Sequence, residues 1–210
     1  MAVRESRWGE DDGLHMSSSV TSPEDAPSPA GSVHYDRVAV ALHWLIAVFL
    51  IGQISLGWYL GTVPRGTPAR SLYVNFHKST GLTLALLILI RLYWRLTHPP
   101  PPLPPFLPSW ERKAARWNHL ALYGCMLIMP LSGYIASNFS KYGVKLFNIV
   151  SLPPWGVDDP TLYALFNGTH IVTSYAFVTL IVLHIAAAVR HAVQRDGILQ
   201  RILPTTRSRV

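Results

Sequence analysis

Four long apolar blocks are the feature of this sequence that most limits its fold. They cover about residues 38–60, 76–95, 117–137 and 162–190, and the charged residues lie between them and at the ends of the chain. A helix rises about 1.5 Å per residue, so each block is long enough to cross a hydrocarbon core of about 30 Å. The charged fraction is only 14%. This segregation predicts an all-α integral membrane protein, a four-helix bundle, rather than a soluble globule.

The segments between the blocks contain residues that break helices. Pro64 and Pro68 lie in the first of these segments, residues 61–71. The second opens with His98 and a run of prolines, which should form a stiff connector without helix. The third, residues 138–160, is a longer loop.

The composition predicts three parts along the chain. Residues 1–33 are rich in Ser, Pro, Gly and acidic residues and contain no apolar run, so we expect a disordered tail and not a signal peptide. Residues 34–195 should form a single membrane domain. Residues 196–210 should form a basic C-terminal tail.

The Lys and Arg residues predict how the bundle is oriented. The net charge is +7, but the basic residues flank apolar blocks, which indicates topology control and anionic lipid rather than nucleic acid. Of the 18 Lys and Arg residues, 13 belong to the two tails, the proline-rich connector and the adjoining helix ends. Because such residues are retained in the cytoplasm, both termini should be cytoplasmic. The other five are Arg65, Arg70, Lys78, Lys141 and Lys145.

Four histidines lie within or at the edge of the apolar blocks: His43, His77, His170 and His184. A polar side chain in hydrocarbon is costly without a partner, so such residues predict a function. His43 and His184 each lie six residues from an arginine at the cytoplasmic ends of their blocks. His77 and His170 lie in the early turns of blocks that begin on the outer side. The four histidines should therefore occupy two depths.

The spacing in the fourth block lets one helix present two histidines. His170 and His184 are 14 residues apart, nearly four turns, so both rings fall on one face, about 21 Å apart along the axis. A haem iron takes two axial ligands on opposite faces, and neutral imidazole is suited to that role. The pattern predicts two haems in the bundle core, one between His43 and His184 and one between His77 and His170.

Other interpretations of the histidines remain open. A single intramembrane histidine is often a hydrogen-bonded contact between helices, although four in two depth-matched pairs are harder to explain in that way. A zinc or copper site would usually gather three or four ligands at one depth. The single cysteine, Cys125, and the lack of a Cys-x-x-Cys-His motif indicate that any haem is bound non-covalently.

Several neighbouring residues are further candidates. His191 lies seven residues after His184 and is its chief rival as a ligand. His119, at the start of the third block, would bond a haem propionate or lie at the interface without a function. Arg91 and Arg95 would pair with propionates or anchor their helix. Four glycines would either let a flat macrocycle approach the backbone or permit close helix packing: Gly57, Gly81, Gly133 and Gly168.

Six short segments, in their order and spacing, resemble the bacterial cytochrome b561 family, which is related to the cytochrome b subunits of nickel–iron hydrogenases. They are Tyr35-Asp-Arg, Ala41-Leu-His-Trp-Leu, Phe76-His-Lys-Ser-Thr-Gly, Ile90-Arg-Leu-Tyr-Trp-Arg, Gly168-Thr-His and Leu183-His-Ile-Ala-Ala-Ala. The resemblance covers about residues 35–204, and the long N-terminal tail departs from the family pattern. It implies a multi-pass protein of the bacterial inner membrane with two haem b groups, held by the same two pairs of histidines.

The resemblance also implies a function. The family passes electrons between the outer face of the membrane and the quinone pool, and some members resemble superoxide oxidases that reduce ubiquinone. We therefore expect an electron-transferring cytochrome whose partners are membrane lipid, quinone and a redox protein. The five outer cations would attract an anionic reductant such as superoxide, or they are ordinary loop charges.

Two alternatives belong to other functional classes. One is a non-enzymatic membrane anchor that carries electrons for a docked dehydrogenase or hydrogenase. The other is a transporter with a proton relay. The second is disfavoured because no Asp or Glu lies inside any of the four blocks, and such relays commonly use them.

Overall fold

Four long helices carry most of the residues that the computed structural model describes, residues 35–204. The prediction for residues 1–33 lies outside this range. Each helix is long and apolar enough to cross a membrane. The all-α, four-helix membrane fold is therefore confirmed. The elements in chain order are α1 (Arg37–Thr62), α2 (Pro68–Thr97), α3 (Ser109–Asn138), β1 (Val144–Leu146), β2 (Val150–Leu152), α4 (Pro160–Gln194) and the 3-10 helix η2 (Leu199–Ile202).

The helices extend beyond the apolar blocks from which they were predicted. Helix α2 begins at Pro68, not near residue 76, so the expected loop is shorter than residues 61–71. Thr67 caps this start by accepting a hydrogen bond from the backbone N–H of Arg70 at 3.2 Å. Proline is well suited to the first position of a helix because its missing N–H is not needed there. Helix α3 likewise begins at Ser109, directly after Pro108.

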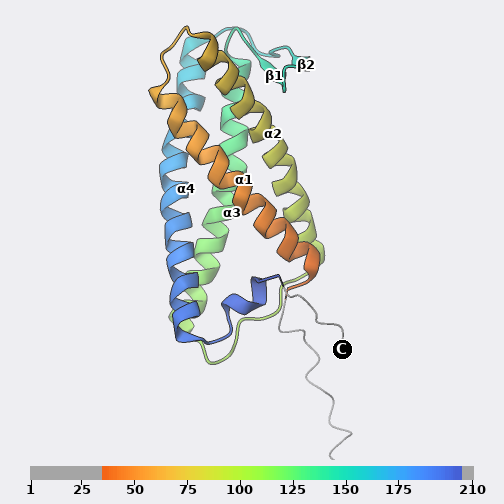
Figure 1. Ribbon diagram of the computed structural model, residues 1–210, viewed down its shortest axis with the longest axis vertical. Helices are drawn as coiled ribbons and strands as arrows, with labels where there is room; N and C mark the ends of the chain where they lie inside the picture. Colours follow the sequence, from red (N-terminus) through yellow and green to blue (C-terminus); the bar gives the residue numbers. More distant parts are fainter. Residues whose placement is uncertain (1–34, 205–210) are drawn as a thin grey trace, which may run out of the picture. The chain divides into compact units, whose positions relative to one another are not determined.

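The helices pack in sequence order. Helix α1 lies along α2, α2 lies beside α3, and α3 lies along α4 (Figure 1). The backbones of α1 and α4 approach each other at few points. The buried core joins all four helices, through residues Ile46, Leu84, Ile88, Leu122, Met126 and Phe177.

The two ends of the bundle carry different loops. At the hairpin end, β1 and β2 pair antiparallel, with Val144 opposite Leu152. The turn between them has Phe147 and Asn148 at positive φ, 47° and 60°. The expectation for this segment was only a loop. At the other end, here called the connector end, α1 begins and α4 ends, and the proline-rich connector joins α2 to α3 (Figure 1).

Candidate functional site

His77 of α2 and His170 of α4 face each other in the half of the bundle near the hairpin. Their ring centroids are 6.1 Å apart. His170 Nδ1 lies 2.8 Å from the carbonyl oxygen of Met129 on α3. A carbonyl can only accept, so Nδ1 carries the proton and Nε2 keeps its lone pair, the tautomer of a metal-ligating histidine. His77 Nδ1 is buried and has no hydrogen-bond partner within the described residues.

Two glycines make room for these rings. A Cβ added at Gly57 of α1 would lie 3.3 Å from His77 Cε1. A Cβ added at Gly133 of α3 would lie 3.0 Å from His170 Nδ1. The pair therefore involves all four helices, two that supply the rings and two that supply the space. The group that each of these two glycines accommodates in the structure is an imidazole.

Gln53 ties α1 to α2 beside this pair. Its Nε2 donates to the backbone oxygen of His77 at 2.8 Å, and its Oε1 accepts from the Thr80 hydroxyl at 2.7 Å. A Cβ at Gly81 would lie 3.0 Å from Gln53 Nε2, so this glycine accommodates the amide. A Cβ added at Gly168, by contrast, would have no other group within 4 Å. In the sequence, the feature that marks Gln53 as a candidate is that it is a polar residue inside an apolar block.

His43 of α1 and His184 of α4 face each other in the half of the bundle near the connector. Their ring centroids are 6.2 Å apart. The ring of Trp44 packs edge-on against His43 at 5.5 Å. Phe177, midway between the two histidines of α4, is buried in the core. The core therefore separates two pairs of imidazoles, one toward each end.

Arg91 of α2 also reaches the His43 pair. It donates to the backbone oxygen of Ala39 at 2.9 Å and approaches His43 Nδ1 at 3.4 Å. A guanidinium only donates, so this longer contact treats Nδ1 as an acceptor. Ligation through His43 Nε2 requires the proton on Nδ1 and therefore requires this contact to be released. Arg91 is then available to an anionic group.

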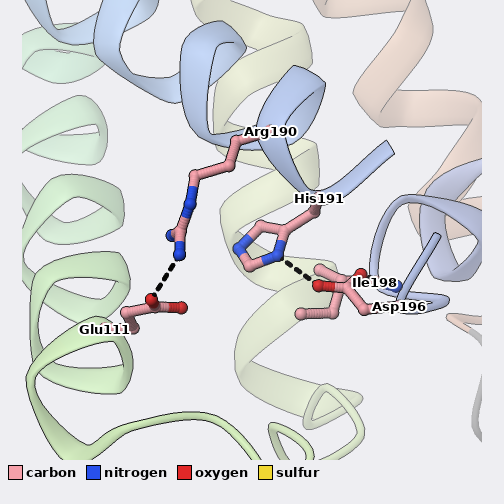
Figure 2. Close-up of polar contacts among 5 residues, drawn as sticks. All are labelled: Glu111, Arg190, His191, Asp196 and Ile198. Carbon is pink, nitrogen blue, oxygen red and sulfur yellow. Dashed lines mark hydrogen bonds and ion pairs between the residues drawn. The ribbon is translucent and has the colours of Figure 1, made fainter. Parts of the chain in front are cut away.

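The two rival histidines have different surroundings. The ring of His119 lies 5.4 Å from that of His184, which brings a third imidazole beside the His43 pair. The Nδ1 atom of His191 contacts Asp196 Oδ2 at 2.6 Å, as Figure 2 shows. Burial would raise the pKa of Asp196, but hydrogen bonds from the Ile198 N–H and from His191 hold it below its usual value. His191 is thus held by a carboxylate.

Other basic residues also have structural partners. Arg190 and Glu111 form an ion pair at 2.8 Å that joins the end of α4 to the start of α3 (Figure 2). Arg95 lies over the ring of Tyr123 at 5.8 Å.

Three of the five cations expected on the outer side also have partners. Arg70 donates to two carbonyls at the end of α1, and Lys78 donates to the carbonyl of Gly143. Lys141 pairs with Asp158.

The two pairs of rings fit a metal with two axial imidazoles. A metal–imidazole bond is about 2 Å long and a ring nitrogen lies about 1 Å from the ring centre, so two imidazoles on opposite sides of one metal have centroids about 6 Å apart. The observed values are 6.1 and 6.2 Å. Within the described residues, no cluster of three or more His, Cys, Asp or Glu side chains could hold a bare metal ion. Two protein ligands at each level suit a haem, whose porphyrin supplies the other ligands.

Comparison with known proteins gives a consistent set of relatives. A family model described as prokaryotic cytochrome b561 matches residues 34–205. Cytochrome b561 homolog 2 of Escherichia coli (strain K12) is 31% identical over 171 residues, which cover 80% of this chain and 90% of the relative. Cytochrome b561 homolog 1 of the same strain is 27% identical, with 81% and 97% covered. A protein of Yersinia pestis named probable superoxide oxidase CybB is 24% identical, with 82% and 97% covered.

Proposed function

We propose, given that this chain belongs to the prokaryotic cytochrome b561 family, that it is a di-haem cytochrome passing electrons to the quinone pool of the bacterial inner membrane. Family membership itself implies binding of b-type haem in a multi-pass bacterial membrane protein. The two haems, their ligands and the quinone are the proposal. The observation that carries it is the arrangement of four imidazoles as two facing pairs, 6.1 and 6.2 Å apart.

The residues hold and orient the cofactors. Bound haem b supplies reversible one-electron transfer, and two imidazole ligands favour that chemistry over oxygen binding. His77 and His170 would hold one haem, with the Met129 carbonyl fixing the His170 ring. His43 and His184 would hold the other, and Arg91 Nη2, which approaches His43 in the structure, would be the donor to a propionate.

A hollow beside Gln53 supports the quinone part of the proposal. It has a volume of about 260 Å³ and is lined by Phe49, Gly52, Gln53, Leu56, Phe76 and Thr80. Mostly apolar walls with a few polar groups are typical of sites for small organic molecules. Phe49 and Phe76 are exposed side chains on membrane-spanning helices, so an apolar molecule would reach the hollow from the lipid.

Haem content tests the proposal directly. Purified protein should contain two haems per chain by haem quantitation and a reduced-minus-oxidised spectrum. His170→Ala should lower the count to one. The control is His98→Ala, because His98 is exposed and stacked on Trp94, and its count should stay at two. One haem in the unmodified protein, or an unchanged count in His170→Ala, would reject the assignment.

Superoxide is the electron donor we propose, supported by the name of the Yersinia pestis relative and by the outer cations. The purified chain should reduce a ubiquinone analogue when superoxide is supplied, without any other protein. If reduction requires a large redox protein that co-purifies with the chain, the chain is instead an electron-carrying membrane anchor.

A further inference from the structure

Helix η2 docks against the proline-rich connector through one buried arginine. Arg201 is 5% exposed. Its Nη2 donates to the carbonyls of Pro101 and Pro102 at 3.0 and 2.9 Å. Proline has no N–H, so a polyproline segment contains carbonyls that its own backbone cannot satisfy. The Arg201 guanidinium donates to two of these carbonyls. The same hydrogen bonds offset the cost of burying its charge.

The same segment also binds the first helix. The backbone N–H of Tyr35 donates to the carbonyl of Arg201 at 3.2 Å. The indole Nε1 of Trp44 donates to the carbonyl of Ile202 at 2.9 Å, across 158 positions of sequence. Trp44 is the residue whose ring packs edge-on against His43 at 5.5 Å. A chain of contacts therefore runs from the connector through η2 and Trp44 to His43.

We propose that Leu199–Ile202 is a latch that positions the His43 ring through Trp44, with Arg201 holding the latch closed. We call this segment the C-terminal latch. The proposal rests on the proposed function, in which His43 is a haem ligand. Trp44 and Arg201 are positioning residues, since neither is itself a ligand in that proposal.

The proposal depends on the Trp44 ring restricting the orientation of the His43 ring. An indole tied by its N–H has a defined plane, and that plane is one wall of the space around His43. Without the hydrogen bond the indole can rotate, and the His43 ring can follow. The orientation of an axial ligand and the groups around it tune the reduction potential of a haem. Loss of the latch should therefore change the reduction potential of the haem proposed at the His43 pair and leave that of the other haem unchanged.

The experiment compares Trp44→Phe and Arg201→Gln with the unmodified, haem-loaded full chain. Phenylalanine keeps an aromatic edge beside His43 but removes the donor to Ile202. In a redox titration one of the two midpoint potentials should shift and the other should stay. In a His170→Ala background, which leaves the His43 pair, the remaining haem should be the one that shifts. Trp110→Phe is the matched control, an exposed tryptophan at the same end of the bundle, and it should shift neither.

A second measurement follows the contact itself and does not need the haem. The indole N–H resonance of Trp44, identified by its loss in Trp44→Phe, should move in Arg201→Gln. An unmoved resonance would overturn the latch. Two retained haems with unchanged potentials in Trp44→Phe would overturn its positioning role, even if the melting temperature falls. Absence of haem from the unmodified protein would instead reject the proposed function, which is a distinguishable result.

Discussion

At the scale of single residues, the His77 pair depends on glycines. A methyl group at Gly133 would lie 3.0 Å from His170 Nδ1 and 3.1 Å from its Cε1. The ring is held on that side by the Met129 carbonyl at 2.8 Å, so it has little freedom to move. Gly133→Ala should therefore reduce haem content from two toward one, by loss at this pair.

The matched control lies on the same helix. Gly124 of α3 has no group within 4 Å of an added Cβ. Gly124→Ala should keep both haems and stabilise the helix by up to about 1 kcal/mol, the difference in helix propensity between glycine and alanine. Equal haem loss in both variants would show that the effect of Gly133→Ala is not specific to His170.

Asp36 gives a prediction for pH dependence. Its carboxylate caps α1 through the N–H of Ala39 at 2.9 Å and accepts from Trp94 Nε1 at 3.0 Å. Burial would raise the pKa of Asp36, but the hydrogen bonds from Ala39, Trp94 and Val38 bring it below its usual value of 3.8. A lowered folded-state pKa gives stability that is present above pH 3.8 and lost as the pH falls through the lower, folded-state pKa.

Asp36→Ala should accordingly cost about 1 kcal/mol at neutral pH, the usual effect of removing a helix cap. The loss should shrink as the pH falls below 3.8. Thermal unfolding of both proteins across that range measures the difference. A cost as large at pH 3 as at pH 7 would show that the charge of Asp36 contributes nothing.

At the scale of elements, the hairpin is attached to α2 by several side chains, among them Asn75, Lys78 and the buried Ser79. The Ser79 hydroxyl is fully buried and accepts from the Phe147 N–H at 2.8 Å. It also lies 2.8 Å from the Asn75 carbonyl and 3.2 Å from the Lys145 carbonyl. Ser79→Ala would leave the Phe147 N–H without this partner, at a cost of about 1–3 kcal/mol.

Hydrogen exchange would reveal the consequence. Residues 144–152 should exchange faster in Ser79→Ala, while the middle of α2 should be unchanged. Ser71→Ala is the control, because among residues 35–204 the Ser71 hydroxyl has a single hydrogen bond, a long one of 3.4 Å to the Thr67 carbonyl of its own helix turn. Unchanged exchange in the hairpin would mean that other contacts hold it.

The elements also show what the sequence could and could not predict. The apolar blocks predicted four helices, and the six motif segments predicted the family, because both signals are local in the chain. The apolar pattern places the start of α2 near residue 76, because Pro68 is typical of a loop, whereas in the structure Pro68 opens the helix. The facing pairs agree with the expected two depths, since a spacing of 14 residues is a simple helical relation. The approach of His119 to His184 and the docking of Arg201 depend on how distant elements pack, which no local pattern records.

At the scale of the whole molecule, the distribution of charge still predicts the orientation. Both ends of the chain should lie in the cytoplasm, with the hairpin end outside. A fluorescent protein fused to the C-terminus should fold and fluoresce in cells. Alkaline phosphatase, which is active only outside the cytoplasm, should be inactive at that position and active when inserted in the loop between α1 and α2. The opposite pattern would reverse the assignment of donor and acceptor sides.

The hydrogen bond between Trp44 and Ile202 has a consequence for biosynthesis. Translation completes α1 long before residue 202 leaves the ribosome, so the indole of Trp44 must wait for its acceptor until α4 has been made and inserted. A nascent chain that stalls after α4 would contain all four histidines of the two pairs. Its α1 would lack the hydrogen bond from Trp44 to Ile202. The C-terminal latch can therefore form only after synthesis has passed residue 202. A cofactor held by the His43 pair would reach its final geometry only after that point.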